Sequence, residues 1–245
     1  MKPIVIRFQP APGLSLAMVP VLAILIALGI WQVKRLHWKT ALLAQIERGT
    51  HLPPEPLAKL LEQQKTGDMI AWRQASVHGH FIARPPQPLY SLRQGKQALR
   101  LLAPFVSDSG IAITVDLGFV PFLPDKTWAL PVDSATPLSL HGILKPVRKP
   151  GPFAIANTPG GLWFSPDTKD LLAPIKTARP LTAFLLDLQG PRNGPDWPEP
   201  APAHADIPNN HLDYALTWFG LALAAIGVYL GWHVRNGRLG LARKR

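Results

Sequence analysis

The chain has 245 residues, 47% of them hydrophobic and 17% charged, with 28 prolines and no cysteine. This apolar share excludes a disordered chain, and the lack of cysteine excludes disulfides, iron–sulfur clusters and thiolate chemistry. The net charge of +11 lies at the two ends, because residues 50–211 hold 15 basic and 13 acidic side chains. A nearly neutral middle argues against a nucleic-acid-binding surface, so no nucleic-acid partner is expected.

The first apolar segment, residues 14–31, has 18 positions without an ionisable side chain. That is about the length needed to cross the hydrocarbon core of a bilayer. A cleaved signal peptide would have a shorter apolar run and small residues at a cleavage site, whereas this segment continues into WQVKRLHWK. We therefore predict a permanent transmembrane helix over residues 14–33.

A second apolar segment lies near the other end, where residues 214–234 are interrupted only by His233. It predicts a transmembrane helix over residues 212–234, followed by a basic tail, residues 235–245. The positive-inside rule places this tail in the cytoplasm, so two spans put the N-terminus there and residues 34–210 outside the cytoplasm. Lys34, Arg35 and Lys39 stand on the side where the rule disfavours basic residues. Either the tail dominates the topology or these residues serve a function.

The middle of the chain shows mainly strand patterns. We expect the first helix to continue as a stalk to about Arg48, and a short helix over Pro53–Gln64. Asp108–Gly110 reads as the turn of a hairpin, Asp167 as the start of a one- or two-turn helix, and the proline-rich residues 191–208 as a tether. Strands are expected over residues 70–82, 99–106, 111–115, 138–144, 162–165 and 181–188.

These elements predict a membrane α+β protein with one β-rich domain outside the cytoplasm, antiparallel and barrel- or sandwich-like. The two terminal transmembrane helices are expected to pack as a hairpin. Small residues four positions apart allow close approach of helices in membranes. We expect Gly220 with Ala224, and Gly227 with Gly231, to face Ala23 and Ala27 of the first helix.

The sequence contains no recognisable catalytic motif. It has no GxxxxGK loop, no GxSxG elbow and no HExxH pair, so we do not expect an enzyme. His78-Gly79-His80 is the one close histidine pair, and on a strand its two side chains share a face. We interpret this as a solvated strand face in preference to a metal site, because no third ligand is nearby in sequence.

The start of the second apolar helix is more distinctive. His211 is followed by Tyr214 and Trp218 at helical spacing, and Asn209 or Asn210 can cap the helix. An interfacial aromatic belt with a hydrogen-bonded histidine would give the same pattern. In a helical hairpin, His211, Tyr214 and Trp218 would lie at the same depth in the membrane as four residues of the first helix: Trp31, Lys34, Arg35 and Trp38.

Two segments, LGIWQVKRLHWKTALL at residues 28–43 and NNHLDYALTWFGLA at residues 209–222, resemble the two ends of the SURF1/Shy1 family of cytochrome c oxidase assembly proteins. Internal blocks fit less closely: VHGHF, VDLGFVP, LHGIL and NTPGGLWFSPD. Leu117 and Phe119 replace an arginine and a tryptophan that are common in the family, so no role of that arginine is transferred here.

The resemblance implies a non-enzymatic assembly factor for a haem–copper terminal oxidase in the inner membrane. It implies transient binding of haem a, with His211 as the iron ligand. Partners would be the oxidase catalytic subunit, other assembly factors and the lipid bilayer. The alternative is a cofactor-free membrane scaffold that stabilises an oxidase subunit. A haem site needs an axial nitrogen, apolar walls and a cation for the propionates. Besides His211, the candidate residues are Tyr214, Trp218, Trp31 and Trp38 for the walls and Lys34 or Arg35 for the cation.

Overall fold

The computed structural model describes residues 4–158, 160–190, 194, 197–201 and 209–243. Most of the expected tether, residues 191–208, lies outside the described residues. The chain divides into two compact units. One contains residues 1–43 and 206–245, and the other contains residues 44–205.

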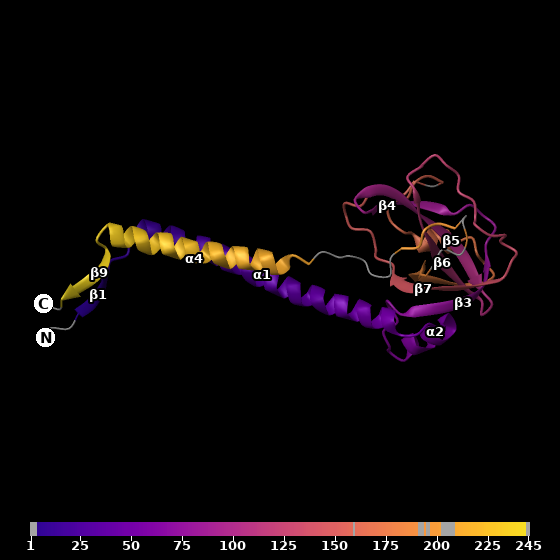
Figure 1. The fold of residues 1–245 in the computed structure, drawn as a ribbon, viewed down its shortest axis with the longest axis horizontal. Helices are drawn as coiled ribbons and strands as arrows, with labels where there is room; N and C mark the ends of the chain where they lie inside the picture. The colour runs from indigo at the N-terminus through magenta and orange to yellow at the C-terminus, as the bar shows by residue number, and fades with distance from the viewer. Residues whose placement is uncertain (1–3, 159, 191–193, 195–196, 202–208, 244–245) are drawn as a thin grey trace. The chain divides into compact units, whose positions relative to one another are not determined.

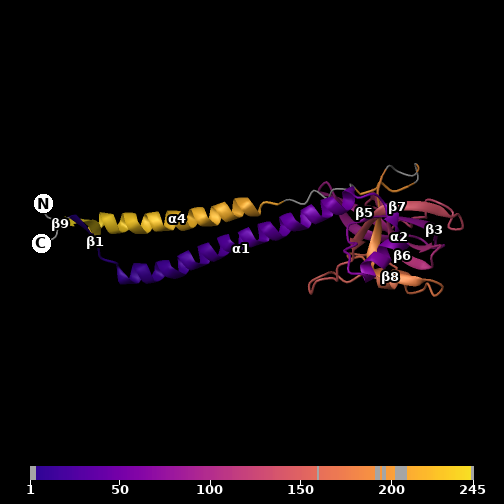
Figure 2. The ribbon, with the colours of Figure 1, turned by 90° about the horizontal axis from the view of Figure 1, so that it is seen from below.

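The first unit consists mainly of two apolar helices. Helix α1 is Pro12–His51 and helix α4 is His211–Arg235, and they run antiparallel beside each other (Figures 1 and 2). Pro12 is the first helical residue, where a missing N–H costs nothing. Helix α1 ends at His51, close to the end expected at about Arg48. Both helices are long and apolar enough to cross a membrane.

The helices do not pack through the predicted glycines. A Cβ added at Gly220, Gly227 or Gly231 would meet nothing within 4 Å, and Ala23 and Ala27 are exposed. That part of the prediction is wrong. Contact occurs instead at Gly29, where an added Cβ would lie 2.5 Å from the ring of Phe219. A large ring on one helix is accommodated by the missing side chain on the other, so the backbones need not touch.

The two ends of the chain form a ribbon that the sequence did not predict. Strand β1, Ile4–Phe8, pairs antiparallel with β9, Leu239–Arg243. His233 is completely buried. Its Nε2 accepts from the backbone N–H of Ala11 at 3.1 Å, and its Nδ1 donates to the carbonyl of Tyr229 at 2.8 Å. This neutral histidine fastens the start of α1 to the end of α4.

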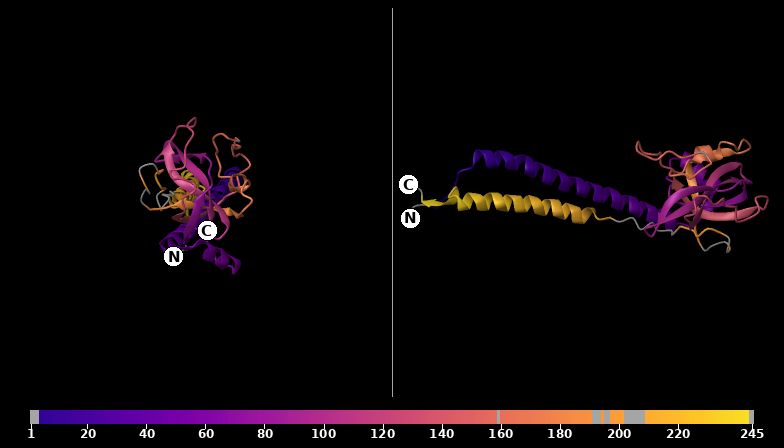
Figure 3. Two further views of the ribbon diagram at one scale, coloured as in Figure 1. Left: turned by 90° about the vertical axis from the view of Figure 1, so that its right-hand side faces the viewer. Right: turned by 90° about the horizontal axis from the view of Figure 1, so that it is seen from above.

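The second unit is a β-barrel with short helices. Its sheet order is β2-β3-β7-β8-β6-β5-β4, and β3 also pairs with β5. Strands β3, β7, β8, β6 and β5 therefore form a closed ring (Figure 3). The elements are β2 Glu55–Pro56, α2 Leu57–Lys65, β3 Gln74–Phe81, β4 Gln87–Arg93, β5 Lys96–Ser107, β6 Ile111–Pro121, β7 Leu138–Pro146, α3 Thr168–Leu172 and β8 Arg179–Leu188.

The barrel closes at Gly79, which pairs with Leu138 of β7 on one side and Ser107 of β5 on the other. A Cβ at this position would lie 2.1 Å from the carbonyl oxygen of Val106. Strand β3 can therefore bridge the two edges only with glycine here. The central glycine of the His-Gly-His motif thus has a structural role.

Several local predictions are confirmed. The β5–β6 hairpin turns at Asp108–Gly110. Asp167 caps α3 by accepting from the backbone N–H groups of Lys169 and Asp170. The barrel interior is apolar, and its large buried side chains include Phe81, Phe105 and Leu117.

Other local predictions are wrong. The sheet is mixed, because β6 and β8 pair in parallel; the long connection through β7 and α3 returns the chain to the end where β6 began. Residues 162–165 form only an isolated bridge, Leu89 to Trp163, and β4 was missed. The helix expected over Pro53–Gln64 begins at Leu57, since Glu55–Pro56 pairs with β3.

Candidate functional site

The structure places His211 against a residue that the sequence analysis overlooked. His211 is the first residue of α4, and its Nδ1 lies 2.8 Å from Oε1 of Gln32 on α1. The amide oxygen can only accept, so Nδ1 carries a proton, and in the neutral imidazole Nε2 then keeps its lone pair. Gln32 is 8% exposed, within an apolar helix. Its conformation is therefore restricted, and it fixes both the tautomer and the orientation of the imidazole.

Most of the other predicted site residues are largely exposed. Trp31 and Tyr214 are each 55% exposed and Trp38 is 49% exposed. The guanidinium carbon of Arg35 lies 4.0 Å from the centre of the Trp38 ring. Lys34 is exposed, and Trp218 is partly buried. Among the described residues, no hydrogen bond or ring contact joins His211 to these side chains.

The start of α4 differs from the expected cap. Asn210 occupies the N-cap position, but its side chain makes no capping hydrogen bond. Its φ of −87° and ψ of 14° are not the extended values from which a cap side chain reaches back to the helix N–H groups. Asp213 remains in the first turn, where a carboxylate complements the helix dipole.

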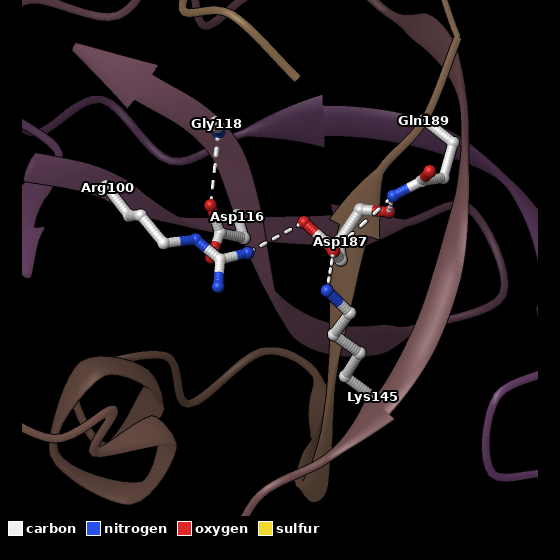
Figure 4. Close-up of polar contacts among 6 residues, drawn as sticks. All are labelled: Arg100, Asp116, Gly118, Lys145, Asp187 and Gln189. Carbon is white, nitrogen blue, oxygen red and sulfur yellow. Dashed lines mark hydrogen bonds and ion pairs between the residues drawn. The ribbon is translucent and has the colours of Figure 1, made fainter. Parts of the chain in front are cut away.

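A second polar cluster lies in the barrel wall, and the sequence analysis missed it. Asp116 of β6 and Asp187 of β8 are direct neighbours in the parallel pairing, and both are completely buried. Nη2 of Arg100 lies 2.6 Å from Oδ2 of Asp116 and 2.8 Å from Oδ1 of Asp187 (Figure 4). Lys145 pairs with the other oxygen of Asp187. Four strands thus contribute two acids and two bases to one neutral cluster.

The electrostatics of this cluster are dominated by burial. The pKa of Asp116 is raised to about 6, mainly by burial and also by the neighbouring charge of Asp187, whereas Arg100, the backbone N–H of Gly118 and Lys145 oppose the shift. Asp116 accepts that N–H at 3.1 Å. The cluster links four strands, and its Asp116 keeps a proton to a higher pH than an exposed aspartate does. The sequence does contain a signal for this cluster, because Asp116 and Asp187 each interrupt a mainly apolar strand.

The His-Gly-His motif lies on an exposed strand face, as predicted. His78 and His80 are both exposed, and Nδ1 of His78 lies 2.5 Å from Oδ2 of Asp108 in the following turn. Within the described parts of the chain, no group of three His, Asp or Glu side chains is placed to hold a metal ion.

Comparison with known sequences covers both candidate sites. The model of the SURF1 family matches residues 19–223. The chain is 28% identical to Surfeit locus protein 1 of Mus musculus in an alignment of 229 positions that covers 85% of this chain and 72% of the relative. It is 27% identical to the SURF1-like protein of Rickettsia bellii in an alignment of 212 positions that covers 84% of this chain and 85% of the relative.

The human Surfeit locus protein 1 is 26% identical over 229 residues, covering 85% of this chain and 73% of that protein. The family match includes Gln32 and His211 as well as the whole closed barrel. The chain therefore belongs to the SURF1 family.

Proposed function

We propose that this protein is an assembly factor for a haem–copper terminal oxidase, anchored in the inner membrane, and that it carries haem a transiently on His211. Membership in the SURF1 family supports the assembly role. The observation that carries the haem proposal is the His211–Gln32 pair. It joins the two segments that carried the family resemblance.

The surface of the helices supports membrane insertion. Only 6% of the most apolar window of α1 and 11% of that of α4 is buried within the protein. A core helix of a soluble protein would bury most of this surface. Leu16, Leu223 and Val228 are each at least 70% exposed, and hydrocarbon is the solvent that suits them.

The topology proposal places residues 34–210 outside the cytoplasm. The β1–β9 ribbon supports it, because paired first and last strands put both ends of the chain on the same side of the helices. Arg235 is the last residue of α4, and Arg238 lies three residues after it. By the positive-inside rule this end is cytoplasmic.

The residues around His211 fit a haem ligand. A histidine that binds a metal usually donates its other ring N–H to an oxygen acceptor, and Gln32 provides that acceptor. Nε2 makes no hydrogen bond to any described residue. When bound, a haem iron would accept that lone pair. Lys34 and Arg35, both exposed, are available to the anionic propionates. The chain thus binds and orients, and we assign it no catalytic step.

One observation favours the scaffold alternative. Trp31, Trp38 and Tyr214 are about half exposed. Exposed aromatic side chains at a helix surface are suited to contacts with helices of another membrane protein. In this reading His211 and Gln32 form only an interhelical hydrogen bond, and no cofactor binds.

A deletion strain tests the assembly role. We expect less haem–copper oxidase, by amount and by activity, while haem a is still synthesised, because a delivery factor acts after synthesis. The measurements are oxidase activity, the reduced spectrum of membranes and extracted haem a. Normal oxidase content would contradict the proposal. Complete loss of haem a would indicate a role in synthesis instead.

A further inference from the structure

A cavity in the barrel unit belongs to neither site described above. Its volume is about 360 Å³, near the lower end of the range typical of small-molecule sites. One wall comes from the β3–β4 connection and the other from residues 122–137, the loop between β6 and β7. The lining residues include Arg84, Pro85, Trp128, Ala129, Leu130 and Val132.

The loop wall is held in place by the barrel. Trp128, Leu130 and Val132 are partly buried and pack against the barrel core. Asp133 orders the end of the loop: its carbonyl accepts from the N–H of Thr136 at 3.1 Å, and its Oδ1 accepts from the N–H of Ala135 at 3.0 Å. The cavity is therefore largely formed before any ligand enters.

Two donors beside this cavity have no acceptor. Nε of Arg84 and Nε1 of Trp128 are shielded from solvent and make no hydrogen bond in the described structure. Arg84 donates through Nη2 to the carbonyl of Leu171, and no carboxylate of the described residues pairs with it. Burial lowers the pKa of Arg84, the direction expected for a cation that has lost water without gaining a counter-ion. Unsatisfied buried donors are costly.

The surrounding charges define the missing partner. Nζ of Lys126 lies 4.1 Å from the centre of the Trp128 ring and adds a second cation. The loop carboxylates, Asp125 and Asp133, are exposed, and Asp133 is occupied in its turn. An anionic acceptor would satisfy both donors and balance the charges of Arg84 and Lys126. A phosphate would leave charged oxygens against the apolar wall of Pro85 and Leu130, whereas a carboxylate on an apolar group would not.

We infer that this cavity binds a small apolar carboxylate, with the carboxylate paired to Arg84 and Trp128 and the apolar body against Pro85, Leu130 and Val132. The planar guanidinium suits a carboxylate, and the indole N–H adds one directional donor. Because both nitrogens are shielded from solvent, binding requires the two side chains to turn toward the ligand. The site is independent of the proposed haem function.

Titration of the full-length protein in detergent tests this site. The probe is 3-phenylpropanoate, and its uncharged amide is the matched control ligand. The readout is the indole N–H resonance of Trp128 in protein labelled with ¹⁵N-tryptophan, assigned through Trp128→Phe. We expect the acid to shift this resonance saturably and the amide to leave it unchanged, because only the acid supplies the anionic acceptor.

Variants separate a built site from general attraction to charge. Arg84→Met keeps an apolar side chain of similar length and should weaken binding of the acid by about tenfold or more. Arg148→Met removes an exposed cation elsewhere on this unit and should have no effect. Trp128→Phe, which loses only the N–H donor, should weaken binding measured by calorimetry. Equal binding of acid and amide, no saturable shift, or equal losses in the Arg84 and Arg148 variants would overturn the inference.

Discussion

At the scale of single residues, the buried Asp116–Asp187 pair is the most constrained feature of the barrel. Adjacent positions on parallel strands force the two carboxylates together, and Arg100 reaches both. Removing one partner of a buried ion pair leaves an uncompensated charge, which usually costs more than the pair contributes. The cluster is therefore sensitive to the protonation of Asp116.

The substitution Asp116→Asn should change how stability depends on pH. The folded-state pKa of about 6 lies above the ordinary value of 3.8, so the folded protein holds the proton more tightly. The stabilisation that the folded protein gains from the proton on Asp116 is fully present below about pH 4 and is lost as the pH rises through 6. Between pH 4 and 7 the variant should gain about 2–3 kcal/mol relative to the wild type. Thermal unfolding followed by circular dichroism measures this difference.

The control for that experiment is Asp125→Asn, which changes an exposed carboxylate in the same unit. Its stability should follow the wild type at every pH. If the Asp116 variant also follows the wild type, the raised pKa of Asp116 is wrong.

At the scale of elements, closure of the barrel depends on β3 pairing with both neighbours at one residue. We expect Gly79→Ala to destabilise the barrel by about 1–3 kcal/mol or more, because the new methyl group would collide with the backbone of β5. Denaturant unfolding provides the measurement. Gly151→Ala, at a position with nothing within 4 Å, is the matched control. Equal stability of the two variants would show that β3 and β5 do not close the barrel at Gly79.

The sequence predicted elements whose signals are local. The apolar run of α1, the hairpin turn at Asp108–Gly110 and the Asp167 cap all depend on neighbours in the chain, and each appears in the structure. The parallel β6–β8 pairing and the contact of Phe219 with Gly29 depend on residues far apart in sequence. Periodicity carries no information about such pairs.

The candidate site shows the same limit. His211 could be singled out by its position at the start of an apolar helix. Gln32 could not, because a glutamine beside Trp31 has no pattern of its own until α4 lies against α1. The aromatic residues were expected to wall the histidine, but helical spacing left their direction unspecified, and several are exposed.

At the scale of the whole molecule, topology is the first claim to test. Alkaline phosphatase fused after Gly151 should be active and the same enzyme fused after Arg245 inactive, because the basic residues after α4 hold that end in the cytoplasm. Phosphatase activity in whole cells, normalised to fusion protein, is the measurement. The reverse pattern would place the barrel in the cytoplasm and contradict the proposed function.

The central claim is that His211, oriented by Gln32, holds haem. The direct measurement is the Soret absorbance of protein purified in detergent from haem-replete cells. We expect a Soret band in the wild type and little in His211→Ala, since the axial nitrogen is gone. Gln32→Leu should weaken haem binding by about 10–100-fold, as loss of a partner that orients a metal ligand typically does.

The control is His37→Ala, which changes an exposed histidine on α1, the helix that carries Gln32. This variant should retain the wild-type band. The account predicts this order: wild type and His37→Ala equal, Gln32→Leu reduced and His211→Ala lowest. If His211→Ala retains as much haem as the wild type with the same spectrum, or if the wild type shows no Soret band, ligation by His211 is contradicted and the scaffold alternative takes its place.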